Sequence, residues 1–281
     1  MKIGIIGLGL IGGSMAKAIK HFTHHTVLGT DIEARVVLKA KMFQVIDEEL
    51  DLESLGECEI VIVAVYPQAT IDFVREHAER LCGTIVIDCG GVKRIVQDAL
   101  CPVAREHGFT FIGGHPMAGI EYSGFEYSKI DLFDGATMIL TPDAGINIDL
   151  LDSVKQFFLS LNFGRIQISS PEEHDSVIAY TSQLAHVLSS AYVKSELAMK
   201  FQGFSAGSFI DMTRVALLNE VMWTELFLEN SENLASEVEG LAERLAQYAA
   251  AMRGHDAETL LNLLGEGAKR KKFLMEREVE Q

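Results

Sequence analysis

The chain has 281 residues, of which 48% are apolar, so it can fill the core of one large domain or of two ordinary ones. It carries 24 lysine and arginine residues against 40 aspartate and glutamate residues, and the resulting formal net charge of −16 disfavours general binding to nucleic acid. The sequence contains no run of eighteen apolar residues, so no membrane span is predicted. The four cysteines lack metal-ligand spacing, so no metal site is predicted. We therefore expect a soluble cytoplasmic protein without nucleic-acid, membrane or metal partners.

Short β-branched segments alternate with helical patterns over the first 170 residues. The predicted strands are Ile3–Ile6, Thr26–Thr30, Ile60–Val65, Thr84–Ile87, Thr110–Ile112 and Thr137–Leu140. The predicted helices are Ser14–His21, Glu33–Lys41, Thr70–Arg80, Val92–His107 and Asp149–Leu161. This alternation, with strands that are nearly continuous in apolar character, predicts an α/β fold with a parallel, doubly wound sheet of the Rossmann type.

The second part of the chain has a different pattern. Residues 1–170 hold 18 of the 24 glycines, and no proline follows Pro171. Long helices are therefore expected from Pro171 onward, with later ones over Ser208–Leu217, Glu220–Phe227, Ser231–Met252 and Asp256–Glu276. We predict a Rossmann domain over residues 1–168 and an all-helical domain over 169–281. Several of these helices carry more apolar surface than one neighbour can cover, which favours a homodimer.

A glycine-rich turn follows the first predicted strand and precedes the first predicted helix. Its sequence is Gly7-Leu8-Gly9-Leu10-Ile11-Gly12, in which the three glycines permit a tight turn, close approach of a pyrophosphate and close helix–strand packing. Asp31 ends the second strand, 19 residues after Gly12, where a carboxylate binds an adenosine ribose and repels a 2′-phosphate. The pattern predicts NAD rather than NADP, although Arg35 nearby is able to accommodate that phosphate. The alternative is a glycine-rich turn with a chance aspartate.

A second glycine-dense segment surrounds a histidine. His115 follows the strand Thr110–Ile112 and a glycine pair, and it precedes Pro116, which favours an extended backbone. It is expected at the carboxyl edge of the sheet, where ligands bind in open α/β folds. A neutral imidazole there can accept the proton of a substrate hydroxyl while hydride leaves the same carbon. The alternative is a loop histidine that bonds a nearby carbonyl.

The helical part offers two further candidate groups. Ser182 and His186 lie one turn apart on the helix that begins at Pro171, on the face expected for Asp175, and can reach one ligand. Asp211 and Arg214 are three residues apart, so the carboxylate can orient the guanidinium for a substrate carboxylate. The alternatives are a structural histidine and an ordinary surface ion pair.

The order of these motifs resembles that of the prephenate dehydrogenase family: a Rossmann half, an HPMAG-E turn, a helix with HD-x6-S-x3-H, and a D-x-x-R segment. The resemblance implies an N-terminal NAD(P) domain and a helical dimerisation domain. It implies oxidative decarboxylation of prephenate to 4-hydroxyphenylpyruvate, or of arogenate to tyrosine. By motif, His115 corresponds to the catalytic histidine, Ser182 and His186 to substrate-pocket residues, and Arg214 to the arginine that binds a substrate carboxylate.

Further residues of the site follow from the resemblance, and the sequence departs from the family at some positions. It places Asp211 and Glu121 in the ionic network and gating around that arginine, and Val65 and Gly91 are assigned to the cofactor site. Gly91 stands where many members have a serine, in Asp88-Cys89-Gly90-Gly91-Val92-Lys93, and Gln183 and Ala185 also depart from relatives. Prephenate and arogenate both remain open as substrates. Other Rossmann-plus-helical reductases and a non-catalytic dinucleotide sensor are the remaining alternatives.

Overall fold

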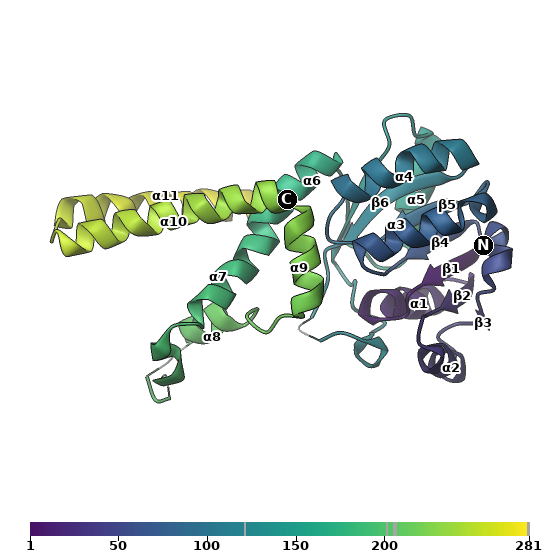
Figure 1. The fold of residues 1–281 in the computed structure, drawn as a ribbon, viewed down its shortest axis with the longest axis horizontal. Coiled ribbons are helices and arrows are strands. Elements are labelled where there is room, and N and C mark those ends of the chain that lie inside the picture. The colour runs from purple at the N-terminus through teal and green to yellow at the C-terminus, as the bar shows by residue number, and fades with distance from the viewer. Residues whose placement is uncertain (121, 201, 205–206, 280–281) are drawn as a thin grey trace. The chain divides into compact units, whose positions relative to one another are not determined.

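The computed structural model of the protein describes residues 1–120, 122–200, 202–204 and 207–279. These residues form two compact units, Met1–Ser231 and Glu232–Gln281. The first unit contains a β-sheet with helices on both faces and a further set of helices (Figure 1). The second unit contains most of one long helix and the whole of another.

One eight-stranded sheet organises the first unit. Its strands are β1 (Lys2–Ile6), β2 (Thr26–Thr30), β3 (Glu48–Glu49), β4 (Ile60–Val63), β5 (Ile85–Asp88), β6 (Thr110–Pro116), β7 (Thr137–Pro142) and β8 (Arg165–Ile168). They lie in the order β3-β2-β1-β4-β5-β6-β7-β8. All neighbouring pairs are parallel except β6 with β7. The predicted Rossmann-type sheet is confirmed, with one reversal where no long crossover helix joins two strands.

Helices cover both faces of this sheet. They are α1 (Leu10–Phe22), α2 (Ala34–Met42), α3 (Pro67–Glu76), α4 (Arg94–His107) and α5 (Ile148–Leu159). Buried side chains of α1, α2 and α5 belong to one apolar cluster, and those of α3 and α4 belong to another. The sheet therefore has a core on each face, as parallel sheets require.

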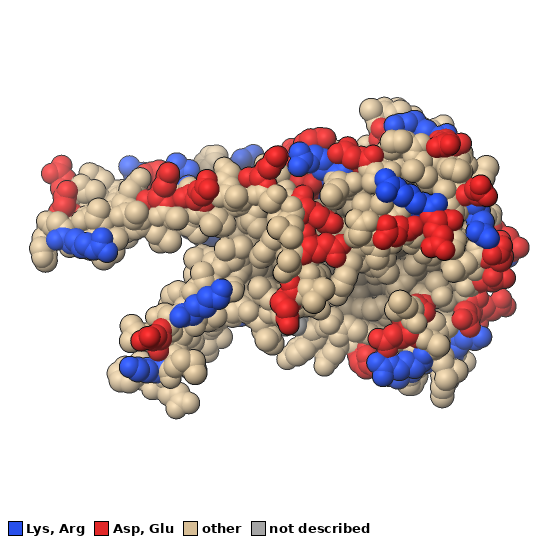
Figure 2. Space-filling view, in the orientation of Figure 1, with Lys and Arg blue, Asp and Glu red and all other residues tan. Residues whose placement is uncertain are grey.

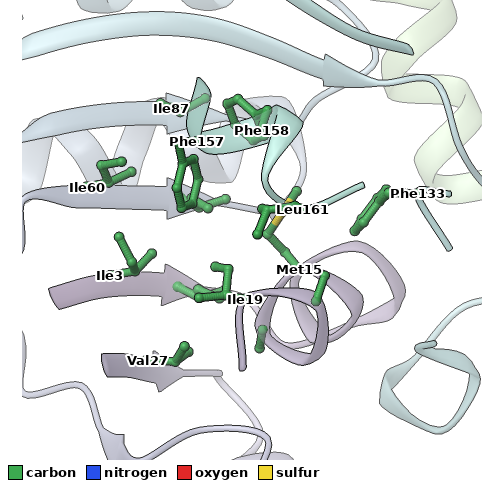
Figure 3. Close-up of a cluster of buried hydrophobic side chains, with 14 of the residues drawn as sticks. Ile3, Met15, Ile19, Val27, Ile60, Ile87, Phe133, Phe157, Phe158 and Leu161 are labelled. Carbon is green, nitrogen blue, oxygen red and sulfur yellow. The ribbon is translucent and has the colours of Figure 1, made fainter. Parts of the chain in front are cut away.

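Alternation along the strands divides side chains between the two cores. Ile60 and Ile62 of β4 pack in the first cluster with Phe158, whereas Val61 and Val63 pack in the second. Figure 3 shows the first cluster, in which strand residues face helix residues such as Met15. Each fully buried side chain of this kind contributes roughly 1.5–3 kcal/mol. The rigid sheet that results fixes the positions of the strand ends.

The helices after the sheet begin within one residue of their predicted starts. Ser170 caps α6 (Pro171–Ile178) by accepting a hydrogen bond from Glu173 N at 3.2 Å. A π-helical segment, η4 (Ala179–Gln183), joins it to α7 (Leu184–Tyr192). The wider turn means that Asp175, Ser182 and His186 do not follow the spacing of one straight α-helix, in contrast to the prediction. Such segments are frequent at functional sites.

Two shorter helices complete the first unit, α8 (Gly207–Thr213) and α9 (Glu220–Glu229). The long helices α10 (Ser231–Arg253) and α11 (Ala257–Val279) form a helical hairpin, in which the Tyr248 hydroxyl donates to Leu263 O at 3.1 Å. Leu245, Leu261 and Leu264 of the hairpin are exposed. Among the described residues, no helix is long and apolar enough to cross a membrane.

Acidic and basic side chains share the face drawn in Figure 2, where blue groups are scattered among more numerous red ones. Surface ion pairs of the protein include Arg80 with Glu53 at 2.7 Å and Arg105 with Asp143 at 2.6 Å. Pairs this exposed stabilise the fold by at most about 1 kcal/mol each.

Candidate active site

The glycine loop has the geometry that its three glycines predict. Gly7 has φ +85°, and a Cβ there would lie 2.6 Å from a methyl of Val65. A Cβ on Gly12 would lie 1.8 Å from the carbonyl oxygen of Gly7, so helix and strand pack too closely for any side chain. Apart from its neighbours in the chain, a Cβ on Gly9 would meet no atom of the described residues within 4 Å. Gly9 therefore borders open space, as required where a ligand approaches the backbone.

The loop runs directly into α1. Gly9 is the N-cap residue and provides no side-chain cap, so the first-turn N–H groups of Leu10, Ile11 and Gly12 are not capped by it. The first N–H groups of a helix have no partner within the helix, and together with the helix dipole they favour an anion. The helix begins four residues before the predicted start at Ser14 because the glycine motif itself forms the first turn.

Asp31 lies against this loop. Its carboxylate accepts hydrogen bonds from Leu8 N at 2.7 Å and from Glu33 N at 2.9 Å. A carboxylate has about four acceptor positions, so two remain for ribose hydroxyls. Arg35, which was the argument for NADP, pairs with Glu33 at 2.6 Å. The loop, Asp31 and Val65 thus form one cluster at the carboxyl end of β1.

His115 is the penultimate residue of β6, a strand that continues four residues beyond its predicted end. Pairing with β7 places it opposite Ile139 and extends the strand. Its Nδ1 lies 2.9 Å from Nε2 of His174, and the residue is half-buried. Burial, with the nearby His174 and Lys93, lowers the pKa of His115 well below its ordinary value near 6.5. The imidazole is therefore neutral at neutral pH and able to accept a proton.

A buried carboxylate supports this histidine pair from the helical side. His174 Nδ1 lies 2.7 Å from Asp175 Oδ1, and both residues of α6 are only 2% exposed. Asp175 also accepts from the backbone N–H groups of Lys93 at 2.8 Å and Arg94 at 2.9 Å, at the start of α4. The carboxylate therefore fixes α6 to the end of the sheet next to His115.

A second buried pair fixes the strand that carries His115. The Lys93 ammonium bonds the Asp88 carboxylate and donates to Gly114 O at 2.7 Å, while Asp88 accepts from Gly114 N at 3.1 Å. Lys93 is fully buried and Asp88 is 1% exposed. The charges compensate each other, as a buried ion pair requires. Gly114, which precedes His115, is therefore held by hydrogen bonds at both its N–H and its carbonyl.

The predicted substrate residues lie farther along the helical part. His186 donates from Nδ1 to Val215 O at 3.1 Å, and its ring centroid is 3.9 Å from that of Trp223. Arg214 immediately precedes Val215 and is exposed, as is Asp211 in the last turn of α8. Burial lowers the pKa of His186, which Arg214 lowers further. His186 and Arg214 are therefore neighbours in space, although 28 positions separate them.

Helix α9 connects these groups to the sheet. Asn230 donates to Asp175 O and to Gln183 Oε1, both at 2.8 Å, and Gln183 donates to Leu226 O at 3.3 Å. A Cβ on Gly91 would lie 3.5 Å from a Leu226 methyl, so Gly91 faces α9. Ser182, next to Gln183, is partly exposed on η4. Glu121, which was predicted to take part in gating, lies outside the described residues.

Two family models match the chain. The model described as prephenate dehydrogenase, nucleotide-binding domain, matches residues 15–166, and the one described as prephenate dehydrogenase, dimerization domain, matches residues 170–266. The chain belongs to the prephenate dehydrogenase family. This confirms the predicted family, with its nucleotide-binding and helical parts and its dehydrogenase class of enzyme.

Individual relatives agree with the family assignment. Prephenate dehydrogenase of Bacillus subtilis is 30% identical over 266 residues, or 91% of this chain and 71% of the relative. Prephenate dehydrogenase from A. aeolicus, solved with hydroxyphenyl propionate and NAD+, matches with a TM-score of 0.82 and 29% identity over 98% of both chains. Synechocystis arogenate dehydrogenase matches with a TM-score of 0.81 and 26% identity over 97% of this chain and 100% of that one.

The buried network was only partly visible in the sequence. His174 and Asp175 are the first two residues of the HD-x6-S-x3-H motif, which predicts one helix but not a contact of His174 with His115. Lys93 and Asp88 were noted only as parts of the segment in which Gly91 replaces a serine. Charged residues at predicted core positions would have indicated such a network, because buried charges require partners.

Proposed function

We propose that the protein oxidises prephenate with NAD and releases carbon dioxide to give 4-hydroxyphenylpyruvate, a step of tyrosine biosynthesis. The observation that carries the proposal is the neutral, partly exposed His115, held by His174 at the carboxyl end of β6. The parallel strands from β1 to β6 bring this end to the same edge of the sheet as the glycine loop. Cofactor site and proton acceptor therefore share the edge where α/β enzymes bind ligands.

The chemistry assigned to the chain is proton acceptance and positioning. His115 accepts the proton of the ring hydroxyl. The ring carbon that bears this hydroxyl becomes a carbonyl as hydride leaves it. NAD, when bound, is the hydride acceptor. The dienone that forms loses carbon dioxide and becomes aromatic, which supplies the driving force. Arg214 binds a substrate carboxylate, and Asp211 orients the Arg214 guanidinium. Ser182 and His186 line the substrate pocket.

Cofactor binding is assigned to the glycine loop and its neighbours. Gly9 and the N-terminus of α1 would hold the pyrophosphate, Asp31 would accept from the ribose hydroxyls, and Val65 and Gly91 would border the nicotinamide. Support comes from the open space at Gly9 and the two acceptor positions left on Asp31. The Arg35–Glu33 pair supports NAD over NADP.

The same proposal covers the domains of the protein, its oligomeric state and its location in the cell. Residues 1–168 form the NAD domain, and residues 169–281 form the helical domain that completes the substrate site and makes a homodimer. The exposed leucines of the α10–α11 hairpin supply apolar surface for that contact. Four free cysteines are consistent with a cytoplasmic location.

The glycines of the loop provide a test of cofactor binding. Gly9→Ala should leave the melting temperature unchanged, because the new Cβ meets no described atom within 4 Å apart from its chain neighbours. It should weaken NAD binding at least tenfold by filling the space of the pyrophosphate. Gly12→Ala should lower the free energy of unfolding by about 3 kcal/mol, since its Cβ overlaps the Gly7 carbonyl. Thermal unfolding and calorimetric NAD titration measure both. Unchanged NAD affinity in Gly9→Ala would place the pyrophosphate elsewhere.

The proposed activity is tested by absorbance at 340 nm with prephenate or arogenate and with NAD or NADP. We expect turnover with prephenate and NAD, release of one carbon dioxide per NADH, and a higher KM for NADP. A higher kcat/KM with arogenate would make the protein an arogenate dehydrogenase, the activity named for the Synechocystis relative. Binding of NAD without turnover of either compound would favour a dinucleotide sensor.

A further inference from the structure

The contacts of His174 determine which nitrogen of His115 carries a proton. Asp175 lies at one end of a line of three side chains, with His174 in the middle and His115 at the other end. The separations are 2.7 Å from Asp175 Oδ1 to His174 Nδ1, and 2.9 Å from His174 Nε2 to His115 Nδ1. Each ring has two nitrogens, and a neutral ring has one donor and one acceptor. The direction of the hydrogen bonds along this line can therefore be derived from its fixed end.

The fixed end is the Asp175 carboxylate. Its Oδ1 accepts from Lys93 N and its Oδ2 accepts from Arg94 N, both of which are backbone donors. An ionised carboxylate only accepts, so His174 Nδ1 carries the proton that it donates to Oδ1. In a neutral ring the other nitrogen, Nε2, then has a free lone pair. That lone pair faces His115 Nδ1, which must be the donor.

Both rings are neutral at neutral pH. Burial lowers the pKa of His174, although Asp175 and Asp88 oppose that effect, and burial lowers the pKa of His115 well below 6.5. The charged and titratable groups that face His174 are Asp88 from β5, Lys93 before α4, His115 from β6 and its own neighbour Asp175. The Lys93 charge is balanced by Asp88. The neutral state required for the chain of donors and acceptors is therefore the state that these surroundings favour.

We propose that His174 and Asp175 are positioning residues that hold His115 as the Nδ1–H tautomer and leave its Nε2 lone pair for the substrate hydroxyl. This inference rests on the proposed function of His115 as the proton acceptor. When the hydroxyl proton moves to Nε2, His115 becomes an imidazolium, and its Nδ1–H continues to donate to His174. The Asp175 charge, acting through His174, stabilises that cation beside Lys93. No other proton moves among Asp175, His174 and His115. The electron pair of the broken O–H bond stays on the substrate oxygen and forms the carbonyl as hydride leaves the same carbon.

The reverse tautomer would remove the activity without moving the ring. If His115 carried its proton on Nε2, the nitrogen that faces the hydroxyl would be a donor and could not accept. In serine proteases, a histidine held in the wrong tautomer by loss of its aspartate loses about 10⁴-fold in kcat. The direction of the hydrogen bonds from His115 through His174 to Asp175 therefore affects the rate separately from any effect on stability.

The direct test is a nitrogen-15 spectrum of the full-length protein with labelled histidine at neutral pH, with the His115 signals assigned by their loss in His115→Asn. We expect a protonated Nδ1 and an unprotonated Nε2 on His115. A protonated Nε2 in the wild-type protein would overturn the proposal. This readout does not depend on turnover: the expected spectrum in a protein that oxidises neither prephenate nor arogenate would leave the tautomer intact and refute only the proposed function.

Kinetics provide the second test. His174→Phe fills the same space without an acceptor and should lower kcat about 100-fold with little change in the KM for NAD. His174→Gln retains an amide oxygen to accept from His115 and an amide N–H to donate to Asp175, so it should recover most of kcat. In a His115→Asn background, His174→Phe should change the residual rate less than twofold. Equal kcat losses in the Phe and Gln variants, or an undiminished effect without His115, would show that His174 is only structural.

Discussion

His115→Asn should lower kcat by a factor of about 10²–10⁴, the range that a general base contributes, while NAD affinity stays within twofold of wild type. Asparagine keeps a polar group at Nδ1 and so can still bond His174, but it has no basic nitrogen for the substrate hydroxyl. His115 lies on β6, whereas the glycine loop follows β1, so the substitution leaves the cofactor site unchanged. Steady-state kinetics with prephenate and calorimetric titration with NAD measure the two effects separately.

A matched control for this variant is His24→Asn, the same chemical change at an exposed loop histidine. It should leave kcat, KM and the melting temperature at their wild-type values. A near-normal kcat in folded His115→Asn would assign proton acceptance to another group. A large loss in both variants would indicate a general effect of histidine loss on the protein.

Arg214→Ala should raise the KM for prephenate roughly 30-fold, with a smaller change in kcat and none in the KM for NAD. The change corresponds to loss of about 2 kcal/mol, typical of a hydrogen bond to a charged group. Arg214 is exposed and lies next to Val215, whose carbonyl accepts from His186, so the guanidinium is placed beside a second predicted substrate residue. Initial rates over a range of prephenate concentrations give both constants.

Arg214→Lys is the informative comparison for the arginine. Lysine retains the charge but lacks the planar fork that binds a carboxylate through two parallel hydrogen bonds. Its KM should lie between those of wild type and Arg214→Ala. An unchanged KM in Arg214→Ala would mean that the substrate carboxylate is bound by another group. A raised KM for NAD would instead place Arg214 at the cofactor.

Local sequence patterns predicted the parts of the site that depend on local geometry. The glycine loop and Asp31 are specified by the close contacts of a strand, a turn and a helix, and those contacts restrict which residues fit. Gly12 shows this directly, because any side chain there would overlap the Gly7 carbonyl. The start of α6 was predictable for a similar reason, since Pro171 begins its first turn, which Ser170 caps.

Contacts between distant segments were not predictable in this way. His115 and His174 are 59 positions apart, on a strand and a helix, and no period or spacing relates them. The π-helical segment η4 depends on packing rather than on propensity, so a straight helix was expected through Ser182. Two strands were not predicted because they lack a continuous apolar run. They are β3, which has only Glu48 and Glu49, and β8, which contains Arg165 and Gln167. The reversal at β7 follows from a connection without a long helix.

The role of His115 as the proton acceptor is tested by the pH dependence of kcat/KM for prephenate in wild type and in His115→Asn. Because burial depresses the pKa of His115, the neutral base persists as the pH falls, and activity should decline only below pH 6.5, with a slope of one proton. The residual activity of His115→Asn should lack this decline. An identical acid limb in both proteins, or a wild-type limb centred above pH 6.5, would contradict neutral His115 as the proton acceptor.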